Sequence, residues 1–228
     1  MDVAAGTIVV WSDIGCPWAH RCVHRLHETR ARLGLDDAVR FDHRAFPLEL
    51  HNERPTPRPV LSAEIPVVGA LDPAAGWQVW QAPDWQWPST TLLALEAVQA
   101  AKAQGLAASE QLDRALRRAF FGESRCISIL PVVLHVASAC PGVDADVLGK
   151  ALRDGEGRLA VIEQFERSQT DDVKGSPHLF LADGSDWPNP GVEMHWEGKS
   201  GRGFPVVDGD DPSVYDEILR RAAATSGA

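Results

Sequence analysis

Short apolar runs open the chain, and proline-rich and then helical patterns follow. Residues 7–11 are largely apolar and β-branched, which is typical of a buried strand. After a turn come Cys16 and Pro17, and because proline is favoured at the first helical position, we expect a helix with Cys16 as its N-cap. This helix should end near Gly34, and residues 39–45 form a second strand pattern. The order strand, helix, strand predicts a right-handed crossover between parallel strands.

Residues 46–88 contain eight of the sixteen prolines and four of the eight tryptophans. Proline interrupts helices and strands, so we expect an irregular Pro/Trp-rich loop here. Its aromatic content argues against disorder and favours a functional loop. The tryptophans either pack as core under the loop or form an aromatic wall over a groove at Cys16, for which Trp87 is a candidate.

Between residues 89 and 169, apolar side chains recur every three to four positions, as in amphipathic helices. The clearest of these helices has Ser109 as its predicted N-cap and Gly122 just beyond its end. An earlier helix should end at Gly105. Further helices are expected near residues 131–139, 145–153 and 159–169.

Strand patterns return in the last part of the chain. Residues 178–181 form a short run before an Asp-Gly turn, and apolar side chains alternate with polar ones over residues 192–196. A final helix is expected with Asp211 as N-cap and Pro212 at its first position. The order βαβ, helical block, ββα predicts an α/β fold. Residues 1–88 and 170–228 would form one domain, into which the helical residues 89–169 are inserted.

Composition and charge exclude several partners. The net charge of −10 gives an acidic surface that repels phosphate backbones, so we expect no nucleic-acid partner. No stretch approaches the roughly 18 consecutive apolar residues of a membrane span, so we expect no membrane partner. The N-terminus has no basic segment followed by an apolar stretch, and four cysteines without disulfide or zinc-finger spacing fit a reducing compartment. We therefore expect a cytoplasmic protein, whose oligomeric state the sequence leaves open.

The thiol of Cys16 differs from those of Cys22, Cys126 and Cys140 in its predicted place. Free backbone N–H groups at a helix N-terminus stabilise an anion, so this position favours a thiolate. Alternatively, Cys16 is an inert buried side chain, since free cysteines are often buried. His20, one turn later, is a candidate to stabilise the thiolate as an imidazolium.

His20, His24 and His27 form a stripe along the same predicted helix. Imidazole and thiolate are good zinc ligands, but the ends of this stripe are two turns apart, too far for a single ion. We therefore expect a stripe at the solvent edge and no metal site.

The segment Cys16-Pro17-Trp18-Ala19, directly after the first strand and turn, resembles the active-site segment of DsbA-like thioredoxin-fold proteins. The cytoplasmic FrnE-like branch, with its all-helical insertion, is the most similar. The resemblance implies a thioredoxin fold (βαβ … ββα) with an all-helical insertion. It also implies that Cys16 is the nucleophile and that its neighbours Pro17, Trp18 and Ala19 help to bind the thiol substrate.

A second motif lies in residues 173–180, which are similar to the family's cis-proline loop and the strand after it. The resemblance implies that Pro177 faces Cys16 and that the backbone of Ser176 pairs with a bound thiol or peptide. The isomer of the Ser176–Pro177 bond does not follow from the sequence, because few X–Pro bonds are cis.

One position departs from the family's Cys-x-x-Cys pattern, because Ala19 stands where the second cysteine would be. A mixed disulfide on Cys16 then has no internal thiol to release it. Cys22 is too distant, because six helical residues rise by about 9 Å. We therefore expect a one-cysteine enzyme that uses an external small thiol.

Three functions stay open at this point. The leading hypothesis is a thiol-dependent oxidoreductase that acts on a small thiol, an electrophilic small molecule or a protein disulfide. The second is a transferase or isomerase similar to kappa-class glutathione transferases and 2-hydroxychromene-2-carboxylate isomerases, in which a serine usually stands at the position of Cys16. The third is a non-catalytic binding module. No covalently bound cofactor is expected, and a low-molecular-weight thiol is the candidate cofactor. The predicted site comprises Cys16 as the catalytic residue, with Pro17, Trp18, Ala19, His20, Trp87, Ser176 and Pro177 around the thiol.

Overall fold

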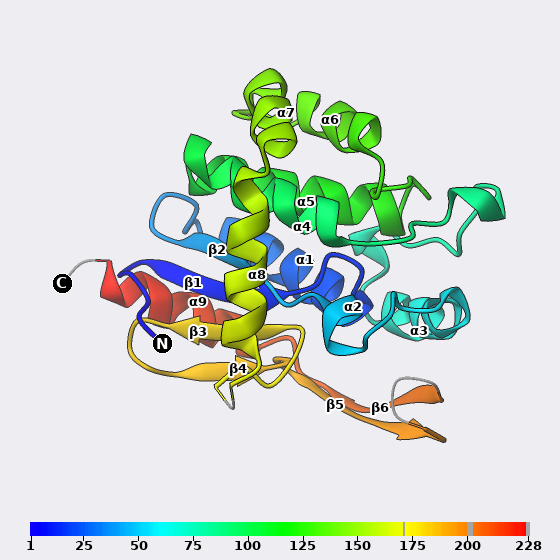
Figure 1. Cartoon of the computed structure of the whole chain (residues 1–228). Coiled ribbons are helices and arrows are strands. Elements are labelled where there is room, and N and C mark those ends of the chain that lie inside the picture. The colour runs from blue at the N-terminus through cyan, green and yellow to red at the C-terminus, as the bar shows by residue number, and fades with distance from the viewer. Residues whose placement is uncertain (171, 200–202, 227–228) are drawn as a thin grey trace.

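Four strands form a mixed sheet at the centre of the computed structural model, which describes residues 1–170, 172–199 and 203–226 (Figure 1). The strand order is β2-β1-β3-β4. β1 is parallel to β2, as predicted, and antiparallel to β3, which is in turn antiparallel to β4. The strands are β1 (Thr7–Ser12), β2 (Arg40–Ala45), β3 (His178–Leu181) and β4 (Asp186–Pro188).

Helices α1 (Pro17–Arg32) and α9 (Val214–Thr225) pack together on one face of this sheet. Ile8 of β1, Leu26 of α1 and Ile218 of α9 are fully buried in the hydrophobic core between them. The prediction of Asp211 as N-cap of the last helix is wrong. Ser213 holds that position, and the Asp211 carboxylate instead accepts hydrogen bonds from the backbone N–H and the hydroxyl of Ser213, at 2.9 and 2.6 Å.

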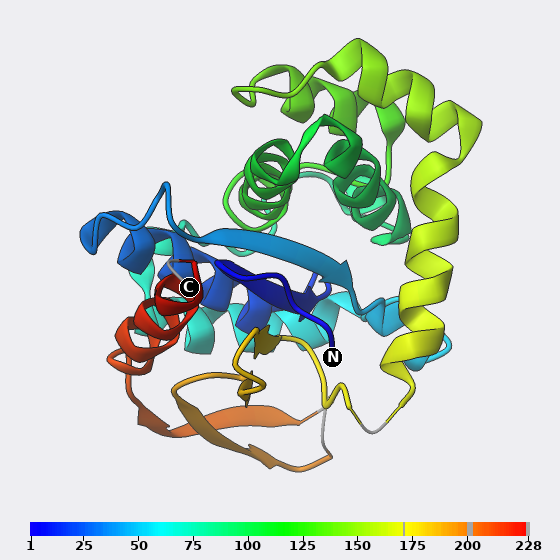
Figure 2. The same cartoon turned by 90° about the vertical axis from the view of Figure 1, so that its left-hand side faces the viewer.

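Five helices lie within residues 89–169, where the sequence predicts a helical block, and they supply most of a second hydrophobic core. Figure 2 shows the last of them, α8, leading from this helical block back along the sheet. No helix in the described part of the chain is long and apolar enough to cross a membrane. The helices are α4 (Leu92–Ala101), α5 (Leu106–Phe121), α6 (Leu130–Ser138), α7 (Ala145–Asp154) and α8 (Glu156–Ser168).

Two boundaries in this block were predicted wrongly. α4 ends at Ala101 and not at Gly105, because Lys102–Gln104 form a 3₁₀ turn. Ser109 does not cap α5, because the N-cap is Gly105, four residues earlier. The Ser109 hydroxyl donates instead to the carbonyl oxygen of Val98 at 2.9 Å, and so joins α5 to α4. The C-terminal prediction is confirmed, since α5 ends at Phe121 with Gly122 as its C-cap.

The expectation of an irregular loop over residues 46–88 is wrong for α2 (Leu48–His51) and α3 (Arg58–Leu71). Pro57 and Pro59 do not interrupt α3, because they lie at its N-cap and in its first turn, where no helical hydrogen bond is lost. Pro66 is inside the helix. Burial of neighbouring Ile65 and Val68 stabilises α3 against the loss of that hydrogen bond.

The predicted strand at residues 192–196 exists, but it does not join the central sheet. β5 (Val192–Glu197) pairs antiparallel with β6 (Phe204–Asp210) in a separate two-stranded sheet. The place beside β3 is taken by β4, which at three residues is too short for a periodic signal. The β5–β6 hairpin packs against α3 through β6.

The contact between α4 and α8 depends on a glycine. A Cβ atom at Gly157 would lie 2.1 Å from the carbonyl oxygen of Glu96. We expect Gly157→Ala to lower the free energy of unfolding by about 1–3 kcal/mol, because the two helices must move apart. Urea denaturation measures the loss. Gly149→Ala in α7 is the control, since its Cβ would meet only side-chain atoms, the nearest at 3.1 Å, and equal stability of the two variants would contradict the prediction.

Candidate active site

Cys16 occupies the N-cap of α1, and Pro17 follows at the first helical position, as predicted. The backbone of Cys16 is extended, and its N–H donates to the carbonyl oxygen of Asp13 at 3.3 Å. The Cys16 thiol donates to the carbonyl oxygen of Ser176, with 3.2 Å between Sγ and the oxygen. The fold therefore brings together the two segments that the sequence singled out.

Ser176 fastens the loop before β3 to the turn before Cys16. Its hydroxyl oxygen accepts a hydrogen bond from the backbone N–H of Asp13 at 2.9 Å. The Ser176–Pro177 peptide bond is cis. Ser176 is thus hydrogen-bonded both to Asp13 and to Cys16.

The thiol of Cys16 is buried, with only 5% of the residue exposed. It packs in a small apolar cluster with Trp18, Ala19 and Val68. Side chains from α2, α3, the loop after α3 and the β5–β6 hairpin cover this cluster. They are Leu48, Leu71, Trp77, Val192, Met194 and Val207.

Burial raises the pKa of Cys16 to about 12, although the hydrogen bond to Ser176 acts in the opposite direction. The expectation that the helix N-terminus makes Cys16 a thiolate is therefore wrong for this conformation. The reason is that burial destabilises the thiolate more than the backbone N–H groups in the first turn of α1 stabilise it. Cys16 is a protonated thiol here.

Glu64 of α3 lies in the same region, and sequence reasoning missed it. Only 7% of Glu64 is exposed, and burial raises its pKa to about 7. The Trp18 indole counteracts this only weakly, since its N–H makes no hydrogen bond of regular geometry. The charged form of Glu64 raises the pKa of Cys16 further. No pattern pointed to Glu64, because it lies within the segment expected to be a loop.

Asp13 and Arg117 fix the turn that carries Cys16. The Asp13 carboxylate accepts hydrogen bonds from the backbone N–H groups of Gly15 and Leu48, at 2.6 and 2.8 Å. Arg117 of α5 donates to the carbonyl oxygen of Asp13 at 2.8 Å and to the hydroxyl of Ser12 at 2.7 Å. A helix of the insertion therefore holds the strand-to-helix turn of the candidate active site.

The predicted role of His20 as an imidazolium is wrong. Its ring is buried, stacks on Phe121 with 4.8 Å between ring centroids, and lies 3.2 Å from the carbonyl oxygen of Ala75. Burial, aided by the nearby charge of Arg117, lowers the pKa of His20 to about 3. A neutral ring of this kind does not stabilise a thiolate by charge.

The solvent-edge stripe predicted for α1 is also wrong, because α1 lies under other elements. His27 is buried like His20, and only His24 is partly exposed. Within residues 1–170, 172–199 and 203–226, no group of three or more histidine, cysteine or acidic side chains is placed to hold a metal ion.

Trp87 does not lie over Cys16. It packs edge-on against Trp80 and Phe120 in the core of the helical block, at centroid distances of 5.1 and 5.5 Å. Trp77 is the tryptophan that contacts the Cys16 cluster. The core interpretation is therefore correct for Trp87, and the aromatic contribution to the site comes from a neighbour ten residues earlier.

The four cysteines all lie among the described residues, and each is a free thiol. Cys22 is buried on the sheet-facing side of α1, in the core with Tyr215. Cys126 and Cys140 belong to the helical block. Ala19 thus leaves Cys16 without a second cysteine in its cluster.

A profile of the DsbA-like thioredoxin domain matches residues 7–197. The chain belongs to this family. No curated protein sequence matches the chain significantly. The candidate active site coincides with the part of the DsbA-like domain in which β1 meets α1.

Solved structures share the fold at low sequence identity. A probable DsbA oxidoreductase from Streptomyces coelicolor is 20% identical over 96% of this chain and 90% of its own, with a TM-score of 0.67. The cytosolic disulfide reductase DsbM from Pseudomonas aeruginosa, also solved with GSH, is 15% identical over 96% of this chain and 95% of its own, with a TM-score of 0.57. A 2-hydroxychromene-2-carboxylate isomerase is 16% identical over 79% of this chain and 87% of its own, with a TM-score of 0.55.

Proposed function

We propose that this DsbA-like protein is a thiol-dependent oxidoreductase that works through Cys16 alone and an external low-molecular-weight thiol. The observation that carries the proposal is the position of Cys16 at the N-cap of α1, with its sulfur 3.2 Å from the Ser176 carbonyl oxygen and Ala19 in place of a second cysteine. A cytoplasmic protein of the FrnE-like branch fits four unpaired thiols. That DsbM has been solved with GSH supports a glutathione-type thiol.

The proposed reaction is thiol–disulfide exchange. Cys16, once deprotonated, attacks one sulfur of a disulfide substrate, whose S–S bond breaks. A mixed disulfide forms on Cys16, and the second sulfur leaves as a thiolate that takes up a proton. The external thiol, as its thiolate, then attacks the substrate sulfur of this mixed disulfide, which releases the Cys16 thiolate and joins the substrate half to the external thiol. A second molecule of the external thiol attacks that new disulfide, so that the remaining substrate sulfur leaves as a thiol and the two external thiols end as one disulfide. Two electrons thus pass from external thiols to the substrate disulfide, and the side chains over Cys16 must move aside for the substrate.

A second candidate is a transferase or isomerase that uses a bound thiol as cofactor. The absence of a second cysteine beside Cys16 favours it, as does the similarity in fold to the isomerase. The third candidate, a non-catalytic module, is favoured by the deep burial of Cys16 and its pKa of about 12.

Incubation with oxidised glutathione followed by intact-mass analysis tests the proposal. We expect one glutathionyl group on the wild-type protein and on Cys22→Ser, the control about 1.7 turns further along α1. Cys16→Ser should carry none. Added reduced glutathione should remove the adduct, and a glutathione-coupled assay should detect reduction of a small disulfide.

Two outcomes would contradict the oxidoreductase proposal. If the wild-type protein forms no adduct after prolonged incubation, the binding-module interpretation takes its place. If an adduct forms but no disulfide is turned over, while an electrophile or an isomerisable aromatic compound is converted with added thiol, the second candidate is favoured.

A further inference from the structure

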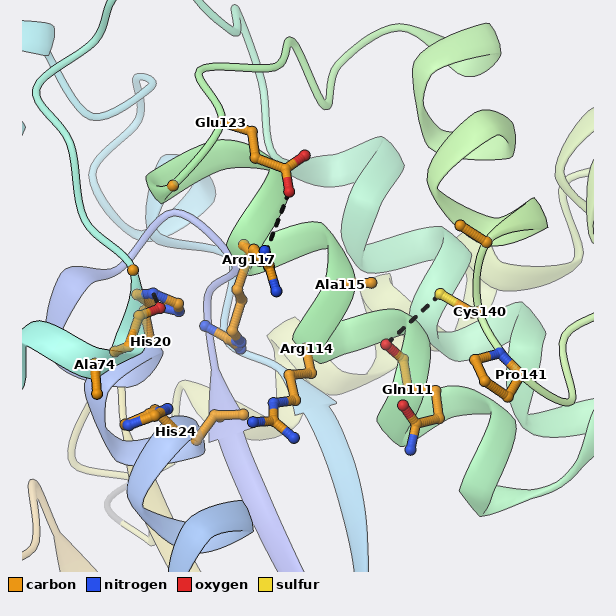
Figure 3. A pocket seen from close by; sticks show the side chains of 16 residues that line it. His20, His24, Ala74, Gln111, Arg114, Ala115, Arg117, Glu123, Cys140 and Pro141 are labelled. Atoms are coloured by element: carbon orange, nitrogen blue, oxygen red, sulfur yellow. Dashed lines mark hydrogen bonds and ion pairs between the residues drawn. The ribbon is translucent and has the colours of Figure 1, made fainter.

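A cavity of about 560 Å³ lies between α1 and α5, beside the short 3₁₀ turn Pro73–Ala75 (Figure 3). Its volume falls within the range of small-molecule sites, about 300–1,000 Å³. The segment after α6, with Cys140 and Pro141, closes it on one side. Cys16 is not among its lining residues, although His20 and Arg117, which lie next to the candidate active site, are.

Cationic side chains gather in this cavity although the protein carries a net charge of −10. Three arginines of α5 line the cavity. Arg117 and Arg118 lie three and four residues after Arg114. Glu123 is the one carboxylate among the cavity-lining residues. The excess of guanidinium groups favours an anionic ligand.

Two of these arginines are available to a ligand. Arg117 is fully committed, since it bonds Asp113, Ser12 and Asp13. The side chain of Arg114 is 46% exposed, and that of Arg118 is 75% exposed. Each makes only a solvent-exposed ion pair, Arg114 with Glu28 at 2.9 Å and Arg118 with Glu123 at 3.3 Å. Exposed pairs of this kind contribute about 0–1 kcal/mol, so an anion can compete for both guanidinium groups.

The rest of the lining suits the body of an organic molecule. Ala74 of the 3₁₀ turn, Ala115 of α5 and Pro141 offer apolar surface. His24 also faces the cavity, and burial lowers its pKa, so it offers an N–H donor as a neutral ring. An inorganic ion would fill only part of this space.

We propose that the cavity between α1 and α5 binds a small organic anion whose carboxylate or phosphate group lies between Arg114 and Arg118. Guanidinium groups form paired, charge-assisted hydrogen bonds with both kinds of group. The apolar wall takes up the remainder of the ligand. This site does not use Cys16 and is independent of the proposed thiol chemistry.

Calorimetric titration of the full chain tests the site. The probes are phenyl phosphate, benzoate and inorganic phosphate, with phenol as the neutral analogue, all at one ionic strength set with sodium chloride. We expect saturable binding of phenyl phosphate, of benzoate or of both, and weaker binding of inorganic phosphate and phenol. The stronger of the two aromatic anions identifies the charged group that the site prefers.

Variants place the binding in the cavity. Arg114→Gln and Arg118→Gln should each raise the dissociation constant about tenfold, the effect of losing one charge-assisted hydrogen bond. Glu123→Gln should lower the dissociation constant, because the carboxylate that competes for Arg118 is removed. Arg221→Gln on α9 is the matched control, since this side chain is 48% exposed and pairs with Glu217 at 2.7 Å. Cys16→Ser should bind as the wild type does.

Several results would overturn the proposal. They are the absence of saturable binding for all probes, equal binding of phenol and the anions, or an equal loss in Arg221→Gln. Inorganic phosphate binding as tightly as phenyl phosphate would overturn the part played by the apolar wall. Because Arg114 and Arg118 are surface side chains, their variants are expected to fold, which a urea transition like that of the wild type verifies.

Discussion

Replacing Arg117 by methionine should lower the free energy of unfolding by about 3–5 kcal/mol, the usual cost of removing one partner from a buried ion pair. Arg117 is fully buried, and its Nε lies 2.7 Å from Oδ1 of Asp113, which is buried too. Although burial acts to raise it, the pKa of Asp113 is lowered, because the charge of Arg117 stabilises the carboxylate. In the variant this carboxylate would be left in the interior without its partner.

The same substitution removes two hydrogen bonds to the turn before Cys16, those to Ser12 and Asp13. Methionine fills much of the space of arginine, so the loss reports on charge and hydrogen bonding more than on a cavity. Denaturation in urea at neutral pH measures the change.

Arg118→Met is the control for Arg117→Met, because the neighbouring side chain is largely in solvent, and its stability should stay within about 0.5 kcal/mol of the wild type. The double variant Arg117→Met/Asp113→Leu should recover part of the loss, since the unpaired carboxylate is gone. A loss below about 1 kcal/mol in Arg117→Met, or no recovery in the double variant, would contradict the assigned role of the pair.

Elements with a strong local pattern could be predicted from the sequence. The run at residues 7–11, the Cys16-Pro17 helix start and the period of residues 89–169 each depend on neighbours close in the chain. The structure has strands and helices in all of these places. α3 was missed because its first two prolines lie where a helix tolerates them, a distinction that a count of prolines does not make.

Only the part of the candidate site that lies in the two sequence motifs, residues 16–19 and 173–180, could be predicted. The resemblance brought Ser176 and Cys16 together, and the structure places them in hydrogen-bond contact. The state of the thiol could not be predicted, because it depends on α3 and the β5–β6 hairpin, which cover Cys16 from distant parts of the chain. The same holds for Glu64 and Arg117, whose positions next to the site follow from tertiary packing.

Packing of the helical block against α1 and β2 also explains why the histidines behave differently from the prediction. A stripe that would face solvent on an isolated domain is enclosed once α5 lies on it. His20 and His27 of α1 are buried polar groups at this junction, and so is His43 of β2, which was in no prediction. Burial lowers the pKa of all three, to about 3 for His20 and well below the usual value for His27.

These histidines should make the fold sensitive to acid. In the unfolded chain they bind protons near pH 6.5, whereas in the folded protein they stay neutral to lower pH. Their contribution to the free energy of unfolding is fully present above about pH 6.5, the pKa in the unfolded chain. It is lost as the pH falls from there toward the pKa values in the folded protein. Glu64 and Asp13 act in the opposite sense, because burial raises their pKa values and protonation relieves that cost. The slope of the wild-type free energy of unfolding against pH is therefore the sum of two opposing contributions, one from the histidines and one from the acidic side chains.

His20→Phe separates one histidine from this sum. Phenylalanine keeps an aromatic ring against Phe121 but binds no proton. Between pH 6 and 4, we expect the free energy of unfolding to fall less steeply in the variant than in the wild type, by about 1.4 kcal/mol per pH unit. Urea denaturation across this range measures both slopes. His195→Gln on β5 is the control, because Asp208 raises the pKa of this solvent-facing ring, so that its removal should not flatten the acid slope. Parallel curves for the wild type and His20→Phe would mean that His20 is protonated in the folded protein, contrary to its enclosed position between Trp77 and Phe121.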